Sequence, residues 1–297
     1  MSGRRTAADH NRMLPLADGR QLGWCALGDP AGRPVVYAHG FPGSRLEACF
    51  AEGPARAAGV RLLALDRPGF GRSDPHPRRG LDGWREDVAA LLDALGIERA
   101  GLLGVSAGGP HALGCALHLP TRITAVALLG PLGPVDGGGG TRGMSPLARL
   151  CFRLARRRPV LQAALFHSIA AGIRLSPGLA FRLLTSELPA ADRALFARPE
   201  MRRIWVESLR DSVHRGAAGA IAELRRLAAA WPFDPARIER PVAIWHGSAD
   251  SVVPAAHGRR LAALIPGAVG HWPAGEGHFS LPVNHAGTAL GWLRGTF

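Results

Sequence analysis

The chain has 297 residues, of which 47% are hydrophobic and 20% charged, so it is long and apolar enough for one large domain or two modest ones. This balance excludes intrinsic disorder, which combines low hydrophobicity with high charge, and no glycine period or heptad run indicates a collagen-like or coiled-coil chain. The four cysteines, Cys25, Cys49, Cys115 and Cys151, are far apart and match no metal-ligand spacing. We expect them to be reduced thiols in a reducing compartment.

The formal net charge of +13 comes from arginine alone, because the chain contains no lysine. Nucleic-acid-binding modules combine clustered basic residues with stacking aromatics, whereas only 6% of this chain is aromatic. A GC-rich coding bias explains the abundance of arginine, and we expect no nucleic-acid partner. Residues 1–22 contain no apolar segment typical of a signal peptide, and no run of roughly 18 apolar residues indicates a membrane span. We therefore expect a cytoplasmic protein.

Apolar segments alternate with amphipathic stretches along the chain, which predicts an α/β protein with a mainly parallel sheet. Two short segments flank the Asp18-Gly19 pair and are expected to form a hairpin. Further strands are predicted at Pro34–Ala38, Val60–Leu65, Gly101–Val105, Ile123–Leu129, Pro241–Trp245 and Val269–Trp272, and helices at Leu81–Leu95 and Ala107–Leu119.

This regular alternation stops at Gly130, where Gly and Pro become frequent. Residues 146–230 then have helical patterns and no convincing strand. We therefore predict one α/β core domain, formed by residues 1–132 and 232–297, with a helical lid (cap) of residues 133–231 inserted into it. The predicted lid is strongly basic, with 16 basic and 7 acidic residues.

The motif G-V-S-A-G-G, residues 104–109, follows a predicted strand and precedes a predicted helix. A serine on such a tight turn projects its hydroxyl above the sheet, and glycines two positions before and after it relieve crowding of the strained backbone. The helix N-terminus directs backbone N–H groups towards an anion. Ser106 is therefore the candidate nucleophile, and a serine that merely caps the helix is the alternative.

A second loop, H-G-F-P-G-S at residues 39–44, follows the predicted strand that ends at Ala38. This loop is placed to aim the backbone N–H of Phe41 at the oxygen that also receives the N–H of Ala107. Two such donors form an oxyanion hole, which stabilises the charge that develops on a carbonyl under attack. An ordinary Gly/Pro turn is the alternative.

Two polar residues follow the last two predicted strands. Asp250 lies in the segment 246–254, and His278 lies between glycines in the segment 275–279. Loops at the C-terminal ends of parallel strands form the sites of α/β proteins. We expect His278 to accept the proton of Ser106 and Asp250 to orient His278.

These motifs resemble those of the α/β-hydrolase fold superfamily, in its cap-bearing serine esterase branch, over roughly residues 14–293. The resemblance includes the order Ser, Asp, His along the chain. It implies a mainly parallel sheet with flanking helices and an inserted helical lid. It also implies Ser106 as the catalytic nucleophile, Asp250 as the acid, His278 as the base, and Phe41 and Ala107 as the oxyanion donors. No metal or organic cofactor is implied.

The leading prediction is a serine hydrolase that cleaves a carboxylic ester or thioester through an acyl-enzyme intermediate. A serine nucleophile disfavours haloalkane dehalogenases and epoxide hydrolases, which resemble this fold but use Asp there. One alternative is a biosynthetic enzyme on the same scaffold, either a lyase, a cyclase, an acyltransferase or a C–C bond hydrolase. Another is a non-enzymatic small-molecule receptor. The basic lid would favour an anionic acyl substrate, although solvated arginine is the simpler explanation of its charge.

Other residues in these segments have alternative roles. Some family members place the acid after the strand that follows the helix of the serine motif. The first carboxylate there is Asp136, which lies beside four glycines and is expected to be too mobile. We expect His39 to brace the oxyanion loop, His246 to point into the scaffold, and Trp205 to pack within the lid.

Overall fold

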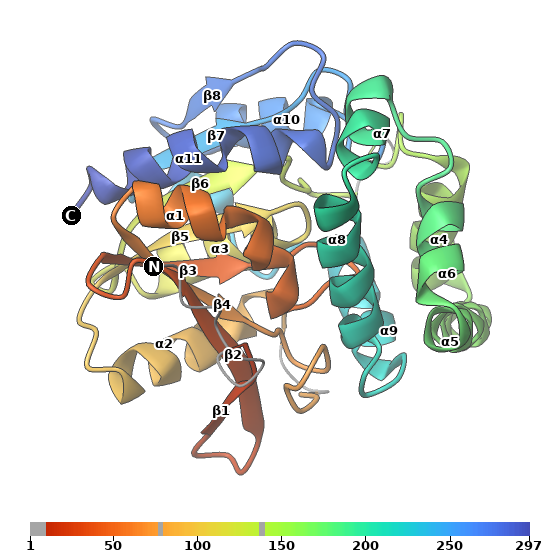
Figure 1. Cartoon of the computed structure of the whole chain (residues 1–297), viewed down its shortest axis with the longest axis horizontal. Helices are drawn as coiled ribbons and strands as arrows, with labels where there is room; N and C mark the ends of the chain where they lie inside the picture. Colours follow the sequence, from red (N-terminus) through yellow and green to blue (C-terminus); the bar gives the residue numbers. More distant parts are fainter. Residues whose placement is uncertain (1–9, 77–79, 137–139) are drawn as a thin grey trace.

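The computed structural model describes residues 10–76, 80–136 and 140–297, and it confirms the predicted α/β class (Figure 1). Its strands form one sheet in the order β1-β2-β4-β3-β5-β6-β7-β8. The strands are β1 (Arg12–Pro15), β2 (Gln21–Gly28), β3 (Arg33–Ala38), β4 (Val60–Leu65), β5 (Ala100–Val105), β6 (Ile123–Leu129), β7 (Val242–Trp245) and β8 (Val269–His271). β1 and β2 form the predicted antiparallel hairpin, and β3 to β8 run parallel to one another.

Helices cover both faces of this sheet. They are α1 (Glu52–Ala57), α2 (Arg85–Ala94), α3 (Gly108–His118), α10 (Ala256–Leu264) and α11 (Ser280–Arg294), with short 3-10 turns at Arg45–Ala51, Leu81–Trp84 and Pro235–Arg237. A Cβ on Gly101 of β5 would meet Leu293 of α11, whereas a Cβ on Gly104 would meet Ala112 of α3. α11 and α3 therefore lie on opposite faces, since alternate residues of a strand point to opposite sides. Every residue of β5 and β6 is buried, which explains their continuous apolar sequences.

A group of helices lies between β6 and β7, where the sequence predicted an insertion. The group consists of α4 (Pro146–Arg157), α5 (Pro159–Leu175), α6 (Pro177–Leu184), α7 (Ala190–Phe196), α8 (Pro199–Ser212) and α9 (Ala218–Ala228). Proline occupies the first turn of α4, α5, α6 and α8, a position where its missing N–H costs no hydrogen bond. Figure 1 shows these helices together at one side of the sheet. Residues 137–139 of the predicted lid lie outside the described residues. All four cysteines are free thiols, as expected.

Candidate active site

Ser106 lies at the sharp turn from β5 into α3 and has a positive φ of 53°. A positive φ is rare for a residue other than glycine and marks a strained backbone. A Cβ on Gly108 would lie 2.1 Å from the carbonyl oxygen of Ala38, and a Cβ on Gly104 would lie 3.1 Å from the Cβ of Ala112. The turn that carries Ser106 therefore requires small residues on both sides, as the spacing of the motif predicted.

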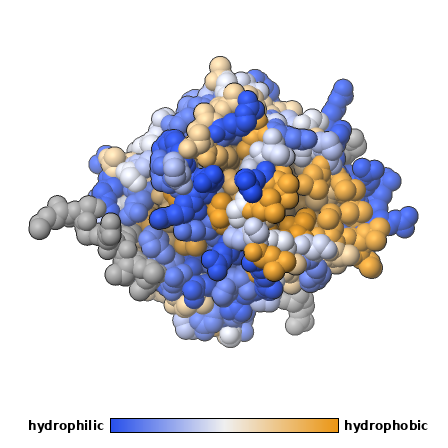
Figure 2. Space-filling model, turned by 45° about the vertical axis from the view of Figure 1, so that its right-hand side comes forward, coloured by the Kyte–Doolittle hydropathy of each residue, from blue (hydrophilic) through white to orange (hydrophobic). Residues whose placement is uncertain are grey.

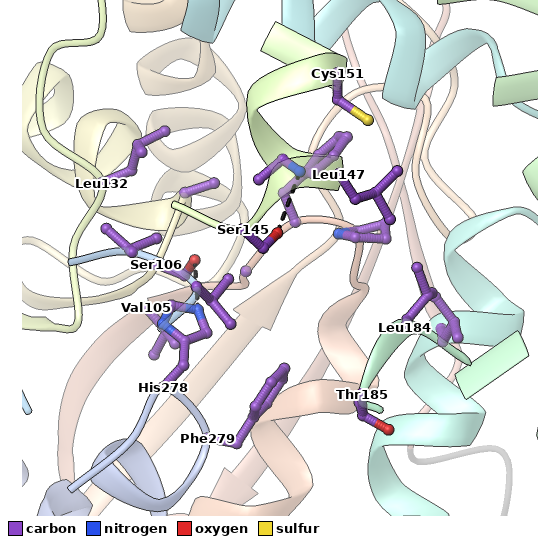
Figure 3. A pocket seen from close by; sticks show the side chains of 18 of the residues that line it. Val105, Ser106, Leu132, Ser145, Leu147, Cys151, Leu184, Thr185, His278 and Phe279 are labelled. Atoms are coloured by element: carbon purple, nitrogen blue, oxygen red, sulfur yellow. Dashed lines mark hydrogen bonds between the residues drawn. The ribbon is translucent and has the colours of Figure 1, made fainter. Parts of the chain in front are cut away.

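The structure brings Ser106, His278 and Asp250 together from three separate loops. Nε2 of His278 lies 3.0 Å from Oγ of Ser106 (Figure 3), and Nδ1 of His278 lies 2.7 Å from Oδ2 of Asp250. The other carboxylate oxygen of Asp250 accepts the backbone N–H groups of Val252 and Val253, at 2.9 and 2.8 Å. All three side chains are buried, and the hydrogen bonds hold Asp250 in place against the imidazole.

The electrostatics of this chain of contacts make the imidazole of His278 a stronger base towards the hydroxyl of Ser106. Burial by itself would lower the pKa of His278, but the charge of Asp250 and its hydrogen bond raise that pKa above the ordinary value. Burial would raise the pKa of Asp250, but the interactions with His278 and His246 lower it to about 2. Asp250 is therefore ionised at neutral pH and accepts a hydrogen bond from the Nδ1–H group of His278. The unprotonated Nε2 then faces the hydroxyl of Ser106.

The sequence analysis also considered Asp136, His246 and Trp205. Asp136 is exposed, and the guanidinium of Arg156 contacts its backbone carbonyl rather than its carboxylate. Nε2 of His246 lies 2.7 Å from the carbonyl oxygen of Val253 and 3.4 Å from Oδ2 of Asp250, so this side chain points into the scaffold and also contacts Asp250. Trp205 is buried, and it both packs within the inserted helices and lines the cavity described below.

The two predicted oxyanion donors face the same space as Ser106. Phe41 and Ala107 both line the cavity beside this serine. Within the part of the chain that the structure describes, neither backbone N–H has a hydrogen-bond acceptor. Both groups are therefore available to an oxygen atom of a bound molecule.

Buried polar side chains hold the loop of residues 39–44 from two sides. The guanidinium of Arg67 donates to the carbonyl oxygens of His39 and Gly40. Nε2 of His39 accepts the backbone N–H of Arg67 at 3.2 Å, so His39 braces this loop as expected. From the other side, Oε1 of Glu47 accepts the N–H of Gly40 at 2.9 Å and the hydroxyl of Tyr37 at 2.6 Å. The sequence analysis assigned no role to Arg67 or Glu47.

A cavity of about 250 Å³ lies beside Ser106, between the sheet and the inserted helices (Figure 3). Its wall is mainly apolar and includes side chains of α4, α5, α6, α8 and α9, among them Leu147, Phe152, Phe166, Phe181, Leu209 and Leu224. Among the described residues that line it, Glu47 is the one acidic side chain, and no arginine is present. The basic charge of the inserted helices therefore does not face the cavity.

Asp192 of α7 is a further residue that the sequence analysis missed. Its carboxylate accepts the backbone N–H groups of His278 at 3.0 Å, Phe279 at 3.0 Å and Ser280 at 2.7 Å. The inserted helices thus hold the loop that carries His278, at the start of α11. Burial raises the pKa of Asp192, while these N–H groups and the charge of His278 lower it, and the net shift is upward.

Glu223 of α9 makes a second link between the inserted helices and the site. Its carboxylate forms a paired contact with the guanidinium of Arg67, at 2.6 and 2.9 Å, and both side chains are buried. The scarcity of acidic residues in this basic segment was the one sequence signal that could have drawn attention to Asp192 and Glu223.

Comparisons with known proteins agree with this fold. Residues 33–284 match the model of the alpha/beta hydrolase fold family. A 2-hydroxy-6-oxo-6-phenylhexa-2,4-dienoate hydrolase of Burkholderia cepacia is 31% identical over 236 residues, which is 75% of this chain and 75% of that protein. The acetyltransferase component of an acetoin cleaving system of Pseudomonas putida is 43% identical, but over only 39% of this chain and 31% of its own length. The solved structure of a hydrolase from Pseudomonas aeruginosa PA01 superposes with a TM-score of 0.67 at 26% identity, over 97% of this chain and 98% of that one.

Proposed function

Because this chain belongs to the alpha/beta hydrolase fold family, we propose that it hydrolyses a neutral, apolar carboxylic ester through an acyl-enzyme formed on Ser106. The observation that carries this proposal is the unbroken line of contacts from Ser106 through His278 to Asp250 at the wall of an apolar cavity. Function must be argued from such a site, because one fold supports many chemistries.

In the proposed reaction, Oγ of Ser106 attacks the carbonyl carbon while Nε2 of His278 takes the hydroxyl proton. Asp250 stabilises the imidazolium that forms, and the N–H groups of Phe41 and Ala107 bind the oxyanion. His278 then donates its proton to the leaving oxygen as the C–O bond breaks, which leaves the acyl group on Ser106. A water molecule that gives a proton to His278 then attacks the acyl-enzyme. His278 returns this proton to Oγ of Ser106 as the acyl–oxygen bond breaks and the acid is released.

The lining of the cavity supports a neutral acyl group. The described lining contains no arginine or lysine that could pair with an anionic substrate, and burial raises the pKa of Glu47, the one acidic side chain there. An acyl group with a carboxylate would therefore lose its hydration without gaining a partner of opposite charge.

Hydrolysis of a C–C bond is the second candidate, and the sequence relatives favour it over ester hydrolysis. The Burkholderia cepacia relative carries the name of a dienoate hydrolase. The same attack by Ser106 on a ketone would release a carbon leaving group, to which His278 would have to return a proton. The carboxylate of a dienoate, however, would find no cationic partner in the described lining of the cavity.

We also propose that residues 133–231 act as a cap domain over a core of residues 1–132 and 232–297. The position of α4 to α9 between β6 and β7 supports this division, and so does their share in the cavity wall. A cap of this kind excludes water from the acyl-enzyme until the hydrolytic step.

The proposal is tested by labelling the purified protein with a fluorophosphonate and by assaying it with p-nitrophenyl esters and with a 2-hydroxy-6-oxo-dienoate. We expect covalent labelling and turnover of apolar esters. Ser106→Ala should abolish both, because loss of the nucleophile typically lowers turnover on the order of a million-fold. Ser168→Ala changes an exposed serine of α5 and serves as the matched control. Turnover of the dienoate without turnover of esters would establish the second candidate, and labelling of Ser106→Ala would refute the assignment of the nucleophile.

A further inference from the structure

The segment that forms α4, α5 and α6 carries an unbalanced positive charge. From residue 137 to residue 186 the sequence contains eight arginines and no Asp or Glu. Arg149, Arg153 and Arg157 of α4 are exposed. In the described residues, no carboxylate forms an ion pair with any of these three side chains. Their charge is therefore available to a negatively charged partner.

The same three helices expose most of the large apolar side chains found on the surface. Of the eleven large hydrophobic residues that are exposed in the described chain, eight lie here: Leu147, Leu150, Val160, Leu161, Leu175, Leu179, Leu183 and Leu184. The exposed fractions reach 87% at Leu175 and 78% at Val160. Figure 2 shows an apolar area gathered on this side of the molecule, bordered by hydrophilic side chains. We call these eight residues, together with Arg149, Arg153 and Arg157, the docking face.

The docking face is continuous with the cavity. Leu147 and Leu184 belong to both, since each is exposed and each also lines the cavity beside Ser106 (Figure 3). An apolar molecule that reaches this surface therefore meets apolar side chains along its way to the serine.

We propose that the docking face binds the surface of a membrane that contains anionic phospholipids. Helices that lie in a membrane interface combine apolar side chains, which enter the acyl boundary, with basic side chains, which contact the headgroups. A second copy of the chain is a poorer occupant, because a symmetric contact would bring the arginines of one face against those of the other. No helix in the described part of the chain has the length and apolarity needed to cross a bilayer, so the attachment is peripheral. This proposal does not depend on which bond the enzyme cleaves.

The test is flotation of the full-length protein with vesicles of phosphatidylcholine alone and of equal parts phosphatidylcholine and phosphatidylglycerol. We expect binding to the anionic vesicles that weakens as salt is added, and much weaker binding to phosphatidylcholine. Arg149→Gln with Arg153→Gln should weaken anionic binding about 25-fold, since each basic residue contributes about fivefold. Leu175→Asn with Leu183→Asn should weaken it on the order of a hundredfold, from about tenfold for each leucine.

The matched controls change exposed residues elsewhere on the molecule. Arg99→Gln and Val269→Asn remove one exposed arginine and one exposed valine outside the docking face, and both should bind like the wild type. Turnover of a soluble ester, or fluorophosphonate labelling, shows that each variant is folded. Absence of binding to both vesicle types, or equal binding by all variants, would overturn the proposal. So would a dimer in sedimentation analysis that the leucine variant dissociates, because a second copy would then cover the docking face.

Discussion

Replacing Asp192 by Asn tests whether the inserted helices position His278, the proposed catalytic base. The carboxylate receives three backbone N–H groups, one on Oδ2 from His278 and two on Oδ1 from Phe279 and Ser280. An asparagine keeps a single acceptor oxygen. The asparagine oxygen can still accept hydrogen bonds from the backbone N–H groups of Phe279 and Ser280. Its NH₂ group would then face the N–H of His278, and two donors cannot form a hydrogen bond.

The size of the effect follows from the bond that is lost. A hydrogen bond to a charged acceptor contributes about 1.5–3 kcal/mol. If this free energy is lost from the positioning of His278, kcat falls roughly ten- to a hundredfold, because about 1.4 kcal/mol corresponds to a factor of ten. Asp192→Asn also removes a negative charge that helps to raise the pKa of His278. The base must be neutral to act, so kcat/KM rises with pH, and its midpoint should move to lower pH in the variant.

The assay is the pH profile of kcat and kcat/KM on a chromogenic ester, with thermal unfolding recorded in parallel. Asp136→Asn is the matched control, because it changes an exposed aspartate of the same predicted lid. A wild-type profile in Asp192→Asn would refute the reasoning. A fall in kcat with no shift of the midpoint would show that Asp192 stabilises the loop without an electrostatic influence on His278.

Four further outcomes are expected. Asp250→Asn should lower kcat about a thousandfold or more on the same ester, because the imidazole loses its orienting anion, whereas Asp136→Asn should change it less than about threefold. In the wild type, kcat/KM should rise through a midpoint above the ordinary imidazole pKa, since the folded protein raises the pKa of His278; a flat profile would count against a histidine base. Glu223→Gln should lower the free energy of unfolding by about 3–5 kcal/mol in a denaturant titration, because it leaves a buried guanidinium unpaired. Gly108→Ala should lower fluorophosphonate labelling along with stability, because its Cβ would collide with a backbone carbonyl of β3.

Local patterns in the sequence were sufficient to predict the α/β class, the strands and the turn that carries Ser106. The strands β5 and β6 are buried on both faces and are therefore continuous apolar runs in the sequence. The motif around Ser106 could be predicted because crowding within a few residues of chain requires a glycine, as the contact that a Cβ on Gly104 would make with Ala112 shows. Asp250 was favoured over Asp136 for a local reason as well, because Asp136 lies beside four glycines and was expected to be too mobile.

The supports of the site depended on tertiary packing. Asp192 lies 86 residues before His278 in the chain, and Glu223 lies 156 residues after Arg67, so no periodic or local pattern relates the members of either pair. The sequence showed that the predicted lid is basic, but the direction of the arginines follows from which face of each helix packs inwards. That packing buries Asp192 and Glu223 against the core and leaves Arg149 exposed, because an ion or a hydrogen-bonding group can leave water only where a partner replaces it.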